Sequence, residues 1–269
     1  MTRPGRTPRP TVRGRRCKES PRPQPRLIVI KTLRYAHRVT TRDHAQLRIA
    51  VDLAILTVRE GALQVLVITR GNEPFAGQPA LPGGFVRIDE DLDAAAVREL
   101  REETDLDGTG LHLEQFGVYG EPQRDPRGRV VSVAYLAIMP DLPLPTAGSD
   151  ASGAEWVALD RARGSLAFDH DRILDDALEQ ARRRLELTTL ATAFCPSEFT
   201  IGDLRSVYET VWGQTLDPRN FSRKVHNTKG FIKPTGGRRL PPTGRPAALY
   251  RAGTLTRLNP PIFRPGREL

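Results

Sequence analysis

The sequence predicts a mixed α/β domain followed by a smaller, basic domain of short helices and a β-hairpin. Two observations lead to this fold class. Between residues 46 and 168, strand-like runs of Val, Ile and Leu surround one carboxylate-rich helix, as in α/β or α+β domains. After a helical connector at residues 169–195, apolar residues take helical spacing and glycine-rich turns follow. The second domain therefore spans residues 196–256, and residues 257–269 form a tail.

The formal charge of +9 on the 269 residues is divided unevenly along the chain. Residues 1–26 carry a net charge of +8, residues 27–196 carry −7 and residues 197–269 carry +8. An acidic middle suits bound cations, whereas basic ends suit a polyanion such as double-stranded DNA. The chain is long enough to form two domains with separate cores.

The first 45 residues are expected to form a basic, largely disordered extension. Residues 1–26 alternate Arg, Pro, Gly and Thr, and they carry too few apolar side chains to offset the entropy of ordering. This segment is either a nucleic-acid-binding arm or an unselected leader. It has no apolar run behind its positive charges, so it does not have the pattern of a secretory signal.

The composition argues against a membrane protein and against a disulfide-stabilised fold. No stretch approaches the roughly 18 to 20 apolar residues of a membrane helix. Two cysteines, Cys17 and Cys195, are too few and too distant for a metal cluster or a disulfide scaffold. We therefore expect a cytoplasmic protein with no membrane partner.

The strands of the first domain are predicted from β-rich runs separated by turn residues. Residues 50–58 and 63–69 form a hairpin around Glu60-Gly61, and a proline-containing loop follows. A helix is expected over residues 91–104 and a connector helix over residues 172–193. The remaining strands are expected at residues 111–119, 130–139 and 155–159.

The helix at residues 91–104 carries the residues with the clearest chemistry. Glu99, Glu102 and Glu103 are spaced i, i+3, i+4 and share one helix face. Three carboxylates on one patch repel each other unless a divalent cation such as Mg²⁺ (or Mn²⁺) lies between them. Gly83 and Gly84, just before the helix, allow backbone to approach a ligand closely. The alternative is a solvated acidic helix face.

The full spacing of this segment resembles the Nudix box. That pattern is Gly, five residues, Glu, seven residues, Arg-Glu, an apolar residue, any residue, Glu-Glu, any residue, Gly and an apolar residue. Here it is filled by Gly84, Glu90, Arg98, Glu99, Leu100, Glu102, Glu103 and Leu106. The resemblance implies that the three helix glutamates bind metal, that Glu90 and Arg98 brace the loop and helix, and that all five form the catalytic set. Asp105 stands where the family has Gly, so we expect a distorted loop or weaker turnover.

A second segment indicates the class of ligand. Arg124 and Arg127 flank Asp125-Pro126, and paired arginines suit a diphosphate, although an exposed turn is the alternative. The segment is similar to one in ADP-ribose-type Nudix proteins, which implies ADP-ribose or a related nucleotide as ligand. The expected ligand-binding residues are Arg70, Gly83, Gly84, Phe85, Arg124 and Arg127.

The basic second domain has the pattern of a winged helix-turn-helix. A helix over residues 200–212 is capped by Thr200 and ended by Gly213, and a second helix over residues 218–228 starts after Asp217. Strands from residue 230 and at 247–251 enclose a glycine- and arginine-rich loop at 234–245, the expected wing. The alternative is a basic packing or dimerisation module. The expected DNA-binding residues are Arg219, Asn220, Arg223, Lys224, Lys233, Arg238, Arg239 and Arg245.

Residues 46–256 together resemble the NrtR family of Nudix-related regulators of NAD metabolism. The segments TIGDLRSVYETVWGQTLDPRNFSRKV and GRPAALYR carry the resemblance in the second domain. It implies a homodimer that represses NAD-biosynthesis genes and leaves DNA when ADP-ribose binds. The alternative function is a Mg²⁺-dependent ADP-ribose pyrophosphatase, of weak or residual activity, that releases AMP and ribose 5-phosphate and uses the winged helix for assembly.

Overall fold

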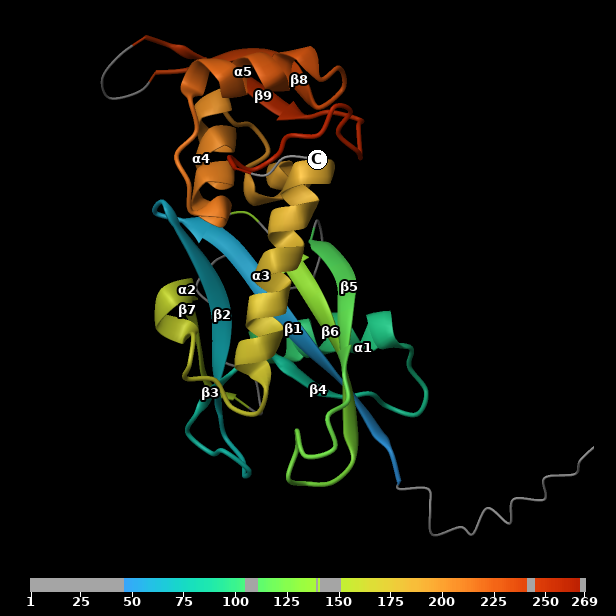
Figure 1. Cartoon of the computed structure of the whole chain (residues 1–269). Coiled ribbons are helices and arrows are strands. Elements are labelled where there is room, and N and C mark those ends of the chain that lie inside the picture. The colour runs from blue at the N-terminus through green and yellow to red at the C-terminus, as the bar shows by residue number, and fades with distance from the viewer. Residues whose placement is uncertain (1–45, 105–110, 139, 141–150, 241–244, 267–269) are drawn as a thin grey trace, which may run out of the picture. The chain divides into compact units, whose positions relative to one another are not determined.

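The computed structural model describes residues 46–104, 111–138, 140, 151–240 and 245–266, which fall within one compact unit, His44–Leu269 (Figure 1). The predictions made for the N-terminal extension, for Cys17 and for Asp105 lie outside the described residues. In the described part of the chain, no helix combines the length and apolar character that a membrane span requires.

The first domain is built on a seven-stranded mixed sheet. Its central strand β1 (Arg48–Arg59) forms the predicted hairpin with β2 (Ala62–Arg70) and pairs in parallel with β6 (Val130–Ile138). The path through the sheet is β3-β2-β1-β6-β5, with β4 against β1 and β7 against β2. The remaining strands are β3 (Pro79–Ala80), β4 (Gly83–Phe85), β5 (His112–Tyr119) and β7 (Ala151–Ala158).

Helices cover both faces of this sheet because the central strands are apolar on both sides. On β1, Leu53 and Ile55 pack on the side of α1 (Leu92–Thr104). Ala54 and Leu56 alternate with them and pack on the side of α3 (His170–Leu187), which crosses the sheet in Figure 1. The predicted α/β sandwich is confirmed.

The connector region differs from the single helix predicted over residues 172–193. A short helix, α2 (Leu159–Ala162), comes first, and α3 then ends at Leu187. Thr188 is extended, with φ −133° and ψ 173°, and its hydroxyl donates to the Arg184 carbonyl. A 3₁₀ helix, η1 (Leu190–Phe194), follows. The chain leaves the helix where Thr188 bridges Arg257 and the Thr189 hydroxyl donates to the Leu255 carbonyl at 2.8 Å, so tertiary partners end α3 before the predicted position.

The two helices of the second domain begin as the sequence predicts. Helix α4 (Ile201–Trp212) starts with a capping box between Thr200 and Asp203 and ends at Gly213, which has φ 68°. Helix α5 (Pro218–Asn227) starts after Asp217, whose carboxylate accepts the Asn220 N–H at 2.7 Å. These caps fix where both helices begin.

The predicted wing is a β-hairpin of β8 (Ile232–Arg239) and β9 (Ala247–Ala252). Strand β8 runs through Gly236 and Gly237, where a loop was expected from residue 234. A register shift between Pro234 and Arg238 accommodates the two glycines inside the strand. The expected loop is therefore shorter than predicted.

The core of the second domain continues into α3. Tyr208 contacts Trp212 and Phe221 edge to face, with ring centroids 4.8 Å and 5.2 Å apart. The Tyr208 hydroxyl also donates to the Leu185 carbonyl at 3.2 Å, and Trp212 Nε1 donates to the Arg182 carbonyl at 3.3 Å. Helix α3 thus packs on the sheet with one part and on α4 with another.

Candidate functional site

The loop before α1 and the helix itself are joined by Arg98. Its Nε and Nη2 donate to the two Glu90 oxygens at 2.8 Å and 2.5 Å, and Nη2 also donates to the Phe85 carbonyl at 3.2 Å. The hydrogen bond from Arg98 lowers the pKa of Glu90 to about 2, and Glu90 in turn raises the pKa of Arg98. Glu90 contacts Arg98 and does not line either of the two cavities described below.

Glu99, Glu102 and Glu103 line one cavity, but each carboxylate is already held by a donor. Glu99 accepts from Arg98 at 2.6 Å, and Glu102 accepts from Arg98 at 3.0 Å and from Arg87 at 2.9 Å. Glu103 accepts the Gly83 N–H at 2.8 Å. Burial raises the pKa of Glu99, and Arg98 partly opposes this. In the described ranges, no three His, Cys, Asp or Glu side chains converge closely enough to hold a metal ion.

The chemistry of this donor set nevertheless fits a divalent cation. All three candidate ligands are carboxylates, the hard oxygen donors that Mg²⁺ and Mn²⁺ take. The backbone at Gly84 lies against Glu99, so that no side chain could fit at this position without displacing the Glu99 carboxylate. A cation would be held after the carboxylates turn from Arg98 and from the Gly83 N–H into the cavity that they share.

Two adjoining cavities make up the site. The larger one, of about 300 Å³, lies beside the glutamates of α1, and the smaller one, of about 70 Å³, lies toward the start of α3. Arg124, which was predicted to bind the ligand, lines the smaller cavity. The two cavities share the other five predicted ligand residues, Arg70, Gly83, Gly84, Phe85 and Arg127.

Arg70 is the cation in this site that is most available to an anion. It donates to the Pro74 carbonyl at 2.8 Å and the Asn72 carbonyl at 3.3 Å, and in the described residues no carboxylate lies within 4.0 Å of it. Burial, and secondly the charge of Arg127, lowers the pKa of Arg70. A ligand phosphate would oppose both effects, because it would place a negative charge next to the guanidinium.

Aromatic rings and arginines alternate along the wall of the smaller cavity. The Arg127 guanidinium lies 4.9 Å from the Phe85 ring centroid and 5.5 Å from that of Phe168. Arg70 lies 4.7 Å from the Phe168 ring on the same wall. Stacked rings and guanidinium groups offer flat faces that suit a planar base. Phe168 was not predicted from the sequence.

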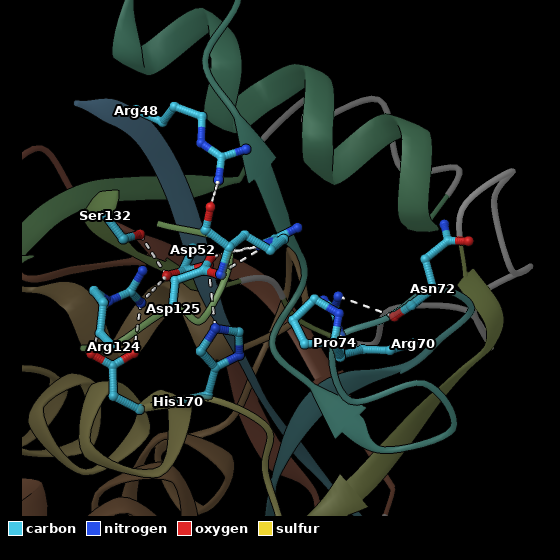
Figure 2. A network of polar contacts seen from close by, with 11 residues as sticks. Arg48, Asp52, Arg70, Asn72, Pro74, Arg124, Asp125, Ser132 and His170 are labelled. Carbon is cyan, nitrogen blue, oxygen red and sulfur yellow. Dashed lines mark hydrogen bonds and ion pairs between the residues drawn. The ribbon is translucent and has the colours of Figure 1, made fainter. Parts of the chain in front are cut away.

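A buried polar network under the smaller cavity was not predicted from the sequence (Figure 2). Asp52 accepts from Ser132 Oγ at 2.5 Å and from Arg124 Nη2 at 3.1 Å, and its other oxygen lies 3.5 Å from His170 Nε2. Arg124 also donates to both oxygens of Asp169, at 2.9 Å and 2.6 Å. The signal for Asp52 was present, since it is the charged residue in the apolar run 50–58.

The ionisation of this network follows from burial and pairing. Burial lowers the pKa of His170, so its ring is neutral near pH 7. The His170 Nδ1 accepts the Leu81 N–H at 3.0 Å, which leaves the ring proton on Nε2, facing Asp52. Burial disfavours the charged form of Arg124, but the hydrogen bonds and charges of Asp169 and Asp52 together outweigh it and raise the pKa of Arg124. Arg124 and its two carboxylates therefore form a charged triad beside the cavity.

The second domain presents its basic side chains to solvent. Arg223 is tied to Asn220 Oδ1 at 2.8 Å on the face of α5. Arg239 turns back to the start of α4, where it donates to Asp203 at 2.7 Å, and it also donates to the Glu198 carbonyl just before this helix at 3.1 Å. All eight predicted DNA-binding residues are exposed, namely Arg219, Asn220, Arg223, Lys224, Lys233, Arg238, Arg239 and Arg245.

Comparisons with known proteins agree with this architecture. Residues 46–177 match the NUDIX domain, and residues 191–252 match the NrtR DNA-binding winged helix domain. The chain is 35% identical over 212 residues to the ADPR responsive transcriptional repressor NtrR of Acinetobacter baylyi, covering 78% of this chain and 83% of that protein. It is 39% identical over 146 residues to an ADP-ribose pyrophosphatase of Methanocaldococcus jannaschii, covering 53% of this chain and 84% of the enzyme.

A solved structure matches both domains together. The crystal structure of Shewanella oneidensis NrtR complexed with a 27mer DNA has a TM-score of 0.67 and 29% sequence identity, covering 78% of this chain and 98% of that chain. The fold and the site thus define a Nudix domain joined to a DNA-binding winged helix. Nudix proteins generally use a divalent metal ion. The chain belongs to the NrtR family, as the sequence resemblance indicated.

Proposed function

We propose that this chain is a transcriptional repressor that binds double-stranded DNA through its winged helix and senses ADP-ribose in its Nudix pocket. The observation that carries the proposal is the joint presence of two sites in one compact unit. One is a pocket with an available arginine and a carboxylate helix, and the other is an exposed basic helix with a basic hairpin. The names of the relatives from Acinetobacter baylyi and Methanocaldococcus jannaschii support ADP-ribose as the ligand.

The positions of the site residues support a proposed role for each of them. Glu99, Glu102 and Glu103 would hold Mg²⁺ or Mn²⁺, and Arg98 with Glu90 would brace them. The cation would neutralise the diphosphate between the two cavities. The ligand would be contacted by Arg70, Gly83, Gly84, Phe85, Arg124 and Arg127.

We further propose that the protein is a cytoplasmic homodimer acting on genes of NAD metabolism.

The proposal is tested with the full chain and two probes. A duplex is first selected from a random library, and its affinity is then measured by fluorescence anisotropy with and without ADP-ribose. We expect saturating ADP-ribose to weaken binding about tenfold, within the usual range of coupling between two sites. Failure to select any sequence, or equal affinity with and without ADP-ribose, would contradict the proposal.

Matched variants assign the two activities to the two sites. Arg70→Gln should abolish the ADP-ribose response and leave DNA affinity without ligand unchanged, because Arg70 lies in the pocket. Arg223→Gln should weaken DNA binding and leave ADP-ribose binding, measured by calorimetry, unchanged. Arg161→Gln, an exposed arginine of the first domain, is the charge-matched control and should change neither.

Hydrolysis of ADP-ribose is a second candidate activity, favoured by the three glutamates that line the larger cavity. A bound divalent cation would supply charge neutralisation and a more acidic water. The chain's own glutamates would hold that cation, and Arg70 would orient the diphosphate. Incubation with ADP-ribose and Mg²⁺, followed by chromatography, should give AMP and ribose 5-phosphate in equal amounts. Activity that survives in Glu103→Gln would exclude this site as its source.

A further inference from the structure

The residue that precedes α3 is bonded in an unexpected way. Asp169 occupies the N-cap position, yet its side chain makes no hydrogen bond to the first turn of the helix. An aspartate at this position usually accepts a backbone N–H two or three residues ahead. Here both carboxylate oxygens accept from Arg124 instead, at 2.9 Å and 2.6 Å. The first turn of α3 therefore lacks the side-chain cap that the Asp169 carboxylate could provide.

Arg124 is in turn a residue of the ligand pocket. Its side chain is 4% exposed and lines the smaller cavity beside Asp52 and His170 (Figure 2). A phosphate or hydroxyl group of a ligand that enters this cavity meets the same guanidinium that holds Asp169. A bidentate arginine–carboxylate pair has a fixed geometry, so moving the guanidinium strains or breaks at least one of its bonds.

We propose that Asp169 is a switch residue, which holds Arg124 while the pocket is empty and caps α3 when a ligand draws Arg124 away. This inference rests on the proposed function, because it explains how ADP-ribose in the pocket reaches the winged helix. The Asp169 carboxylate can either hold Arg124 or cap the first turn of α3, but it cannot do both. A ligand that binds Arg124 therefore favours the capped arrangement over the other, and such a difference in affinity is what shifts the population between two states.

Helix α3 links this switch to the DNA-binding domain. It has 18 residues, a length of about 27 Å at 1.5 Å per residue. Near its other end the Arg182 carbonyl accepts from Trp212 Nε1, and Arg182 Nε donates to the Val211 carbonyl at 2.9 Å. The Leu185 carbonyl accepts from the Tyr208 hydroxyl. These bonds attach α4 to α3. A change in the position of α3 therefore also changes the position of the winged helix domain.

The substitution Asp169→Asn distinguishes the pairing with Arg124 from the capping of α3. Asparagine caps helices as well as aspartate does, but it lacks the charge that holds Arg124. The variant should therefore resemble the ligand-bound state. We expect its affinity for the selected duplex to be about tenfold weaker without ADP-ribose, and to change less than twofold when ADP-ribose is added. Its affinity for ADP-ribose should be equal to or tighter than that of the wild type.

Asp175→Asn is the matched control. Asp175 lies on the same helix, is 57% exposed and pairs with Arg163 at 2.6 Å, so the change removes the same charge without touching Arg124. This control should keep the full response to ADP-ribose. A wild type that responds together with an Asp169→Asn variant that responds equally would overturn the switch and leave the proposed function intact. A wild type that does not respond would overturn both.

Hydrogen exchange on the wild-type chain tests the switch without any substitution. If ADP-ribose lets Asp169 cap the helix, the amide of Asp171 should exchange more slowly in its presence, whereas the amide of Arg172 already donates to the Asp169 carbonyl at 3.1 Å. The amides at the wing, in β8, serve as an internal comparison. Unchanged exchange at the start of α3 under saturating ADP-ribose would overturn the proposal even if Asp169→Asn failed to fold.

Discussion

Arg98 shows how one side chain can organise a site at the scale of single residues. It is 15% exposed, and its guanidinium contacts Glu90, Glu99, Glu102 and the Phe85 carbonyl. A planar group with five donors suits such a position, because several acceptors can be held at fixed angles. Arg98 thus fixes the loop before α1 against the helix and also pairs with the carboxylates of that helix.

The ion pair between Glu90 and Arg98 should make the stability of the fold depend on pH in the acid range. Since the folded state lowers the pKa of Glu90 from 4.5 to about 2, its carboxylate stabilises the fold above pH 4.5, and this contribution is lost as the pH falls toward 2. Glu90→Gln should therefore lower the urea midpoint at pH 6, and the difference from wild type should shrink at pH 3. Urea titrations at both pH values provide the measurement.

The control for this prediction is Glu121→Gln, which removes a carboxylate from an exposed turn. Its urea midpoint should follow that of the wild type at both pH values. If the Glu90→Gln curve lay below the wild-type curve by a constant amount from pH 6 to pH 3, the pairing with Arg98 would not be the source of the stability.

Residues that act together within one helix could be predicted from the sequence, whereas contacts between residues far apart in the chain could not. Glu99, Glu102 and Glu103 could be placed on one face because helical spacing alone determines it. Asp52 and His170 meet across 118 positions of sequence, through a sheet register that the sequence does not reveal. The engagement of the glutamates by Arg98 was also not predicted, because the Nudix pattern gives residue types and not the direction of their side chains.

At the scale of elements, the caps were the most predictable features and the ends of regular segments the least. Thr200 and Asp217 cap the helices α4 and α5 as predicted, since capping depends on neighbours within three residues. The end of α3 at Leu187 and the extent of β8 were mispredicted. Both depend on tertiary partners, such as the bridge between Thr188 and Arg257 that extends the chain after α3.

The segment after the wing also braces α3. The Ile262 N–H donates to the Glu186 carbonyl at 3.0 Å, and Leu258 and Ile262 are buried in the core that α3 shares with the winged helix. Arg264 donates to Glu186 at 2.9 Å and to Glu179 at 2.9 Å. This segment lies beyond residues 191–252, which match the winged helix family. It thus stabilises the connector helix α3 through contacts from outside the winged helix domain.

The prediction at this scale is that Arg264 stabilises the connector. Arg264→Met should lower the free energy of unfolding by about 1.5–3 kcal/mol, because it removes charged hydrogen bonds, one of them to the buried Glu186. Chemical denaturation at pH 7 measures this loss. Arg257→Met, at an exposed arginine of the same segment, should cost less than about 0.5 kcal/mol. Equal costs in the two variants would contradict the assigned role of Arg264.

The distribution of charge is a property of the whole molecule, and it assigns different partners to different regions. Residues 27–196 carry a net charge of −7 although three arginines line the smaller cavity, so a net negative charge and an arginine-lined cavity coexist in this region. Residues 197–269 carry +8, and the exposed basic groups of α5 and the wing are part of this charge. Binding of DNA by such a domain depends strongly on salt, because each phosphate contact releases counterions.

The salt dependence distinguishes basic residues that touch phosphate from those that hold the wing. Lys224 is exposed on α5, and among the described residues no carboxylate pairs with it, whereas Arg239 is paired with Asp203. A plot of log affinity against log salt for the selected duplex should lose about one unit of slope in Lys224→Gln. Arg239→Gln should weaken binding with the slope unchanged, because its guanidinium orients the hairpin and is already neutralised. Arg183→Gln on α3 is the control for net charge, and it should change neither affinity nor slope. If Arg239→Gln reduced the slope as much as Lys224→Gln, Arg239 would be a phosphate contact that leaves Asp203 when DNA binds.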